Sequence, residues 1–444
     1  MTAATPRPRV VVVRRWLPHA VFAVGAVTIA VGLIVRRFTD TPIGVPWPPA
    51  LGNPDLGVHP LLAVSLALFA AAVVLAPRLL DERVRPGAVA LILFVGTLAL
   101  RLALAAGRGG TGEWDQVFDT ARSFEAANEY LPALPTVDLG PGYFVDRFAE
   151  LVPSMPVHVA GHPPGLLLVM HYLGLDTPAR LAAFCIVVGA ISAPLTYALA
   201  RELLPERGAR LAGLLMALSP QALMFGVTTA DTVYCTLGLL AAWPLARARK
   251  VSDTFLARVV GAVALSLASL FAWSLLAIGA WAAILAWRRQ GLRSAIELSA
   301  ICGVVLLAFH GAFAALTGFD PVGTVRATEE VYRLGVASVR PYWYWLFGSP
   351  VGFLLVLGLP ISWLALRELA RGTPEAVAIF AVLAIAALMG FTKAETERIW
   401  LFFAPFVCLA AARALDRRPE LLVPVAAALA VQALLHEGLS DTVW

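Results

Sequence analysis

The sequence has little charge, almost no lysine and few cysteines, and each shortage excludes a class of protein. Charged residues make up 14% of the 444 residues, and 59% of the residues are hydrophobic. A soluble domain carries about 25% charged residues. The chain is therefore predicted to be a membrane protein rather than a soluble enzyme or a nucleic-acid-binding domain.

The only two lysines are Lys250 and Lys393. The phosphate-binding sequence GxxxxGK[ST] is absent, so nothing in the chain indicates ATP as an energy source. The few cysteines all fall inside apolar runs, which argues against a disulfide framework or a thiolate metal site. They are Cys185, Cys235, Cys302 and Cys408. The net charge of +5 has a topological explanation, and we expect no nucleic-acid partner.

The apolar runs have the length of transmembrane helices. Each has roughly 15 to 22 residues, and about 20 suffice to cross a hydrocarbon core. The first run follows a cluster of arginines but has no small-residue cleavage site after it, so we expect it to be retained. About thirteen spans result. They are 17–35, 60–77, 87–106, 181–200, 211–228, 233–246, 256–272, 274–287, 296–316, 346–366, 376–391, 399–413 and 421–437.

Arginine and lysine gather in alternate loops, as the positive-inside rule requires. This pattern puts the N-terminus inside, the C-terminus outside, and the large polar loops 36–59, 107–162 and 318–345 outside. Residues 163–175 are too short to cross, and we expect a short helix that enters the outer leaflet after Pro163-Pro164, since proline suits a helix start.

The chain is accordingly predicted to be all-α, a polytopic transmembrane bundle whose first large outer loop carries short surface helices. Its expected divisions are 1–106, N-terminal transmembrane helices; 107–176, extracytoplasmic catalytic loop and outer-leaflet helix; 177–317, central transmembrane bundle; 318–345, extracytoplasmic loop; and 346–444, C-terminal transmembrane helices.

The first large outer loop is acidic and aromatic, and it begins with Glu113-Trp114-Asp115. Residues Gln116 to Tyr130 have the spacing of a surface helix. Asp115 could be the N-cap of that helix. It could also be a general base, because a carboxylate near an apolar wall can acquire a raised pKa suited to accepting a proton.

Two further polar residues lie at the same predicted face. His162 joins the loop to the outer-leaflet helix, and it is either a hydrogen-bonded interface residue or a ligand group. Asp231 lies between two apolar spans, and it either caps the following helix or belongs to the site.

Cations and aromatic residues complete this face. Residues 392–398 hold Lys393 and Arg398, and a lysine on the side that the positive-inside rule disfavours is well placed for a lipid phosphate. The aromatic run that begins at Tyr342 suits the membrane interface. Like Trp114, it would also stack against a sugar.

In this order the motifs resemble those of the integral-membrane GT-C glycosyltransferases, nearest to the branch of the protein O-mannosyltransferases and the aminoarabinose transferases. The similarity covers roughly residues 95 to 410. The matching features are Glu113 and Asp115; His162-Pro163-Pro164; Arg180-Leu181 followed by a helix that ends Tyr197-Ala198-Leu199-Ala200-Arg201; Ser219-Pro220 leading to Asp231; and Lys393 through Pro405.

The resemblance implies a GT-C-like fold in the plasma membrane, with catalysis on the outer face. It implies a polyprenyl-phosphate-linked sugar as donor, transferred with inversion to a glycan, lipid or protein acceptor. Asp115 would be the base, with Glu113 as second choice, and Asp231 would orient donor or acceptor. Lys393 and Arg398, helped by His162, would hold the lipid phosphate. The aromatic candidates for substrate contact are Trp114 and Tyr342.

The chain departs from the family pattern at three points. It has Glu-Trp-Asp instead of an adjacent Asp-Glu pair, two extra spans before the catalytic loop, and Gly165 where a larger apolar residue is usual. No ligand spacing demands a metal, although Glu113 and Asp115 could bind Mg²⁺ or Mn²⁺. The alternative functions are a transporter or flippase of lipid-linked sugar and a non-catalytic cell-envelope assembly protein.

Overall fold

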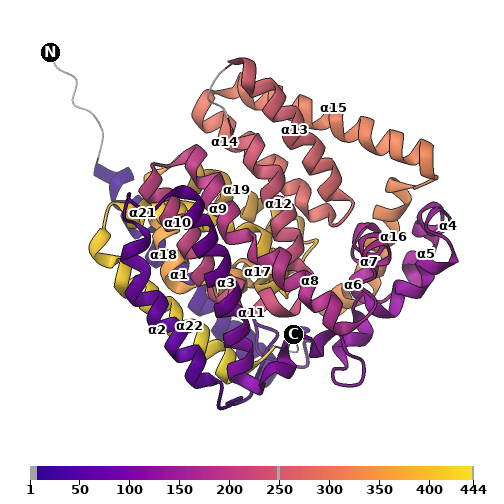
Figure 1. The fold of residues 1–444 in the computed structure, drawn as a ribbon, viewed down its shortest axis with the longest axis horizontal. Helices are drawn as coiled ribbons and strands as arrows, with labels where there is room; N and C mark the ends of the chain where they lie inside the picture. The colour runs from indigo at the N-terminus through magenta and orange to yellow at the C-terminus, as the bar shows by residue number, and fades with distance from the viewer. Residues whose placement is uncertain (1–7, 248–250, 443–444) are drawn as a thin grey trace.

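A computed structural model describes residues 8–247 and 251–442, and it is built almost entirely of helices (Figure 1). The helices of the bundle are α1 (Pro8–Phe38), α2 (Leu62–Leu79), α3 (Pro86–Gly109), α8 (Pro178–Ala190), α9 (Ser192–Leu203), α10 (Glu206–Leu218), α11 (Pro220–Thr228), α12 (Asp231–Ala246), α13 (Val251–Ser269), α14 (Ala277–Gln290), α15 (Leu292–Thr317), α17 (Tyr342–Leu357), α18 (Leu359–Arg371), α19 (Pro374–Met389), α21 (Ala404–Asp416) and α22 (Leu422–Leu439).

Shorter elements fill the connections. The short α-helices are α4 (Pro141–Asp146), α5 (Phe148–Leu151), α6 (Val157–Ala160), α7 (Gly165–Leu173), α16 (Pro321–Leu334) and α20 (Thr396–Ile399). The 3₁₀ turns are η1 (Thr111–Trp114), η2 (Gln116–Phe118), η3 (Glu125–Asn128), η4 (Leu131–Leu139), η5 (Val152–Ser154), η6 (Trp273–Leu276), η7 (Val336–Val339), η8 (Trp400–Phe403) and η9 (Pro419–Leu421). Strands β1 (Asn53–Pro54) and β2 (Ser440–Asp441) pair antiparallel, with Asn53 opposite Asp441.

The prediction of an all-α polytopic membrane protein is confirmed. Within the described residues, seven helical segments are long and apolar enough to cross a membrane, and two bent pairs of helices raise the number to nine. The other four predicted spans coincide with the shorter helices α12, α13, α14 and α19. Thirteen complete crossings therefore stay a prediction.

Two predicted spans are wrong as single helices. Residues 211–228 belong to α10 and α11, which meet at an angle of 51°. Residues 346–366 belong to α17 and α18, which meet at the larger angle of 117°. The break is at Gly358, whose φ of +125° is accessible to glycine but strained for other residues. Pro360 then stands in the first turn of α18, a position that proline favours.

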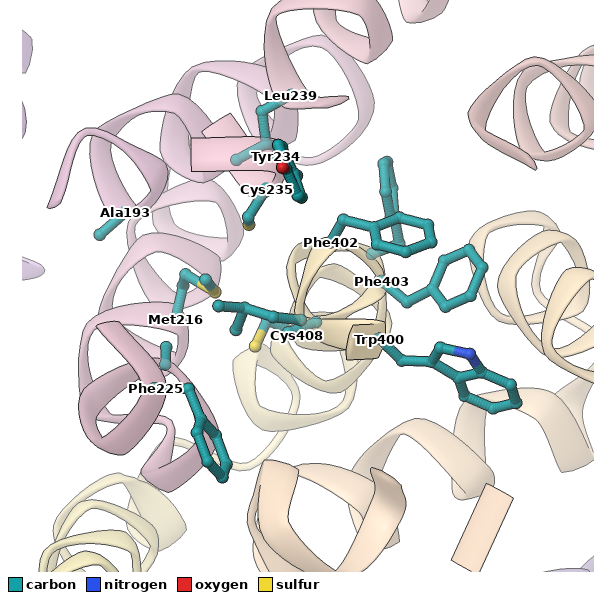
Figure 2. Close-up of a cluster of buried hydrophobic side chains, with 14 of the residues drawn as sticks. Ala193, Met216, Phe225, Tyr234, Cys235, Leu239, Trp400, Phe402, Phe403 and Cys408 are labelled. Atoms are coloured by element: carbon teal, nitrogen blue, oxygen red, sulfur yellow. The ribbon is translucent and has the colours of Figure 1, made fainter. Parts of the chain in front are cut away.

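The core of the bundle lies around α21. Of the segment that includes this helix, 83% is buried inside the protein, against 6% of α15 at the edge of the molecule (Figure 1). Figure 2 shows Cys408 of α21 beside Met216 of α10, and Tyr234 of α12, Phe402 and Phe403 belong to the same buried cluster. The first turn of α12 is thus anchored in the best-packed part of the protein.

Charged side chains join loops that were predicted to share the inner side. Arg210 donates to the carbonyl of Asp81 at 2.6 Å, and Arg289 donates to the carbonyl of Leu203 at 2.8 Å. Arg289 also pairs with the buried Glu375. These contacts agree with the predicted grouping of the inner loops.

The loops predicted to lie outside also contact one another. Arg108 pairs with Asp55 at 2.6 Å and donates to the carbonyl of Glu437 at 2.8 Å. The backbone N–H of Leu51 donates to Glu397 at 2.8 Å. The predicted outer segments are therefore joined in two places, at Arg108 and at Glu397.

The surface helix predicted from Gln116 to Tyr130 is wrong. The segment contains two short 3₁₀ turns, η2 and η3, which are separated by a loop. The side chain of Asp119 accepts from the N–H of Ala121, and that of Ser123 accepts from the N–H of Glu125. Such local bonds compete with the helix ladder, which explains the interruption.

The short helix predicted for residues 163–175 is confirmed as α7, which begins directly after Pro164. The N–H of Gly165 donates to the carbonyl of Leu270 at 2.8 Å, and a Cβ at this position would collide with that carbonyl. The unusual glycine thus permits a close approach between α7 and the turn after α13.

Candidate functional site

Asp231 and Arg398 form a buried ion pair at one end of the bundle. Asp231 is the first residue of α12, and its Oδ2 lies 2.6 Å from Arg398 Nη1. The two side chains are 6% and 5% exposed. The N-cap role considered for Asp231 is wrong, because α12 has Ala230 at its N-cap position and the Asp231 carboxylate binds Arg398 instead.

The ion pair continues into a chain of alternating charges. Arg398 Nη2 donates to Glu395 at 2.9 Å, and Arg340 Nη2 donates to the other oxygen of Glu395 at 2.5 Å. Burial acts most strongly on the Glu395 carboxyl and would raise its pKa, but the two guanidinium groups outweigh it and lower the pKa to about 2. Glu395 is therefore a permanent anion that holds two arginines in place.

The backbone of this segment is strained. Ala394 and Glu395 have φ values of +65° and +57°, and they are the non-glycine residues with positive φ within the described chain. The left-handed conformation costs an L-residue about 1–2 kcal/mol. Such strain is typical of functional sites. Here it turns the Glu395 carboxylate between Arg340 and Arg398.

The loop at residues 107–162 adds a histidine and two carboxylates. His158 Nε2 lies 2.9 Å from Glu125 Oε1 and 3.8 Å from Glu129 Oε1, and all three residues are buried. Burial raises the pKa of Glu129, although His158 and Arg398 oppose it. Asp231 raises the same pKa, so the loop carboxylate and the ion pair of α12 lie within electrostatic reach.

His158 responds to the same groups. Burial is the strongest influence and lowers its pKa, but the Glu129 carboxylate and the hydrogen bond with Glu125 outweigh it, and the pKa rises above its ordinary value. A protonated His158 would be stabilised by its two carboxylate neighbours. The two contacts join parts of the same loop, and Arg398 and Glu395 act on the pKa of His158 from outside it.

His162 belongs to a neutral hydrogen-bonded group beside these charges. Its Nδ1 lies 2.7 Å from the carbonyl of His158 and 3.1 Å from the hydroxyl of Tyr130, which in turn lies 2.6 Å from the hydroxyl of Tyr234. Burial lowers the pKa of His162. Because Nδ1–H donates to the His158 carbonyl, the Nε2 of a neutral His162 is unprotonated and accepts a hydrogen bond, and it could donate to an anion only in the protonated imidazole.

The two candidate bases have partners of their own. Asp115 Oδ1 accepts from Arg122 Nη2 at 2.6 Å, and Asp119 binds the same arginine at 2.7 Å. Glu113 accepts from the side-chain amide of Gln116. Burial raises the pKa of Glu113, against the effect of a nearby arginine. The N-cap role considered for Asp115 is wrong, since no side-chain cap bond is present there.

The remaining predicted residues occupy different surroundings. Trp114 donates from its indole N–H to the carbonyl of Leu102 at 2.9 Å, which ties η1 to α3. Lys393 Nζ lies 3.4 Å from the carbonyl of Ala337, next to the charge chain. Tyr342 is 44% exposed, and its hydroxyl donates to a backbone carbonyl of α19 at 2.7 Å.

The sequence thus identified Asp231, Arg398, His162 and Lys393, which lie in or beside one buried cluster. The other members of the cluster were not selected as site residues. They are Glu125, Glu129, Tyr130, His158, Tyr234, Arg340 and Glu395. A carboxylate or arginine in a loop is usually solvated, and burial was the missing information.

The residues do not fit a divalent metal. Within residues 8–247 and 251–442, no group of three or more His, Cys, Asp and Glu side chains is arranged to hold one. Glu113 and Asp115, the two candidate ligands, bind Gln116 and Arg122 instead. The chemistry proposed below uses no metal.

Comparisons with known proteins give structural similarities only. No protein-family model matches the chain, and no curated protein matches it. The chain is similar to the crystal structure of the Archaeoglobus fulgidus oligosaccharyltransferase in complex with Zn and sulfate, with 15% identity and a TM-score of 0.47 over 79% of this chain and 53% of that one.

A second crystal structure of the same archaeal enzyme, tethered with an acceptor peptide that contains the NVT sequon, is 14% identical with a TM-score of 0.42, over 78% of this chain and 55% of that one. The chain thus spans about half the length of these structures. What the fold and site define is a polytopic helical membrane protein with a buried charge cluster at one end.

Proposed function

We propose that this protein is a membrane glycosyltransferase of GT-C type that transfers a sugar from a polyprenyl-phosphate-linked donor. Its acceptor is an extracytoplasmic glycan, lipid or protein, and the active site faces outward from the plasma membrane. The observation that carries the proposal is the buried row of ion pairs Asp231–Arg398–Glu395–Arg340. The loop at residues 107–162 packs beside it through the contact of Tyr130 with Tyr234. The ordered motifs of the sequence support it.

Arginines held by buried carboxylates suit a phosphate that gains charge as the sugar leaves. Donors that are fixed before the reaction stabilise developing charge without reorganisation. Arg398 and Lys393 are the proposed cations, and His162 is proposed to help hold the phosphate by donating from Nε2 in its protonated form. The Glu395 carboxylate keeps Arg398 and Arg340 oriented while no donor is bound.

The proposed reaction is a single displacement with inversion. The acceptor oxygen forms a bond to the anomeric carbon as the bond from that carbon to the phosphate oxygen breaks. Polyprenyl phosphate leaves with the electron pair, and the acceptor proton passes to a carboxylate, Asp115 in the first instance and Glu113 in the second. Asp231 orients the substrates, and Trp114 and Tyr342 are proposed to contact the sugar.

The test uses the full chain in lipid nanodiscs with radiolabelled polyprenyl-phosphate sugars and a membrane-extract acceptor. We expect sugar transfer by the wild type and loss of transfer by Asp231→Asn. The control is Asp138→Asn, whose carboxylate is 67% exposed beside His171. Saturable donor binding without transfer would favour a transporter or flippase, and neither binding nor transfer would favour an assembly protein.

A further inference from the structure

Arg101 is a buried cation that forms no ion pair with a carboxylate among the described residues. It lies in the membrane-spanning helix α3 and is 0% exposed. Its Nη1 donates to the hydroxyl of Thr232 at 3.3 Å, while Nε and Nη2 have no hydrogen-bond partner among the described residues. An ionisable group inside a membrane span is costly and is usually kept for function.

Two glycines make room for this arginine. A Cβ at Gly226 of α11 would collide with Arg101 Nε, and a Cβ at Gly189 of α8 would collide with the Thr232 hydroxyl. Four helices therefore meet around the Arg101–Thr232 contact. The packing leaves room at this position for a side chain as large as arginine.

The position of Arg101 relates it to the charge cluster. Thr232 directly follows Asp231 in the first turn of α12, so Arg101 contacts the turn that carries the ion pair with Arg398. Arg398 forms ion pairs with Asp231 and Glu395. Within the part of the chain that the structure describes, the hydrogen-bond partner of Arg101 is a hydroxyl group, and charges in a low-dielectric interior are weakly screened.

We propose that Arg101 is a positioning residue whose uncompensated charge makes the Asp231 turn favourable for a phosphate group. The inference rests on the proposed function for the identity of the ligand, a polyprenyl phosphate. Arg101 acts through its field and its bond to Thr232 rather than by touching the donor. Binding of an anion at this turn supplies the negative charge that the protein itself lacks.

The experiment measures the affinity of the full chain in nanodiscs for polyprenyl phosphate, for uncharged polyprenol and for inorganic phosphate. We expect the wild type to bind polyprenyl phosphate more tightly than polyprenol. Arg101→Met should weaken the affinity for polyprenyl phosphate about tenfold without changing the affinity for polyprenol. Arg101→Lys keeps the charge and should retain most of the preference. The melting temperature of Arg101→Met should be unchanged or higher, because an unpartnered charge is removed.

The matched control is Arg258→Met, since Arg258 is a similarly buried arginine that has partners in Glu297 and Ser294. It should lower the melting temperature and leave the phosphate preference intact. A lower melting temperature for Arg101→Met, with both lipids weakened equally, would show a structural role and overturn the proposal. Equally tight binding of inorganic phosphate would overturn the lipid assignment.

The outcome is separable from that of the proposed function. A wild type that transfers no sugar, but whose phosphate preference depends on Arg101, would refute the transferase and uphold this inference. If the wild type transfers sugar and Arg101→Met still binds polyprenyl phosphate more tightly than polyprenol, the transferase is upheld and the role of Arg101 is refuted.

Discussion

The carboxylate of Asp231 lies 2.6 Å from the guanidinium group of Arg398, which comes 167 positions later in the chain, and both side chains are almost completely buried. The pair fixes the start of α12 against the loop before α21. It therefore couples the central bundle to the C-terminal helices at the end where the candidate site lies.

Breaking this pair should destabilise the protein more than removing it. Arg398→Met leaves the buried Asp231 carboxylate without its ion-pair partner, which costs about 3 kcal/mol or more. Asp231→Asn should cost less, because Arg398 keeps Glu395 as a second partner. The double variant should lose less than the sum of the two single losses. Thermal unfolding in detergent measures the three values. Asp176→Asn, in an exposed pair with Arg180, should change the stability by less than about 0.5 kcal/mol.

The pH dependence of stability should show the contribution of the ionised Glu395 carboxylate to the folded state. Its pKa of about 2 lies below the ordinary value of 4.5, so the ionised carboxylate stabilises the folded state above pH 4.5. This contribution is lost as the pH falls from 4.5 toward 2. The melting temperature of the wild type should therefore fall more steeply over this window than that of Glu395→Gln. Parallel curves would contradict the assignment.

The ionisation of Glu129 should have the opposite effect on the stability of the folded state. Burial raises its pKa above the ordinary value, so its ionisation costs stability as the pH rises above 4.5. Glu129→Gln should be more stable than the wild type at pH 7 and equal to it at pH 4. The measurement is the melting temperature at the two pH values, and a variant that is less stable at pH 7 would refute the prediction.

The sequence was sufficient for the all-α fold class and for most of the long apolar helices, because both depend on local composition, while the sidedness of the loops stays a prediction. Apolar runs of spanning length predict helices wherever they occur, and arginine counts predict which loops share a side. The contact of Arg210 with Asp81 agrees with that grouping. The bend at Gly358 could not be predicted, because an apolar run has the same composition whether its helix is straight or broken.

The cluster could be predicted only in part. Asp231 and Arg398 stood out as charges between apolar helices, but their pairing depends on tertiary packing across most of the chain. Glu129 and His158 were not selected as site residues, and their burial follows from how the loop folds onto α12. The left-handed conformation of Glu395, which turns its carboxylate between two arginines, has no signature in the sequence.

The two candidate bases can be separated by their kinetics. We expect Asp115→Asn to lower kcat about 100-fold or more with donor affinity retained, because general-base catalysis contributes about that much. Glu113→Gln should lower kcat less than about tenfold. Asp119→Asn is the control, since Asp119 shares Arg122 with Asp115. If Glu113 is the base instead, the loss will be in Glu113→Gln, and the acid limb of the wild-type pH profile will reflect its raised pKa.

Lys393 should contribute to binding and little to stability. Its ammonium group lies 3.4 Å from the carbonyl of Ala337, a weak contact whose loss costs little. Lys393→Met should weaken the affinity for polyprenyl phosphate about tenfold and leave the melting temperature nearly unchanged. Lys393→Arg should retain much of the affinity. Arg333→Met, in an exposed pair with Glu329, controls for a general loss of positive charge. Unchanged affinity in Lys393→Met would leave the phosphate to Arg398, because Arg398 is the other cation proposed to hold it.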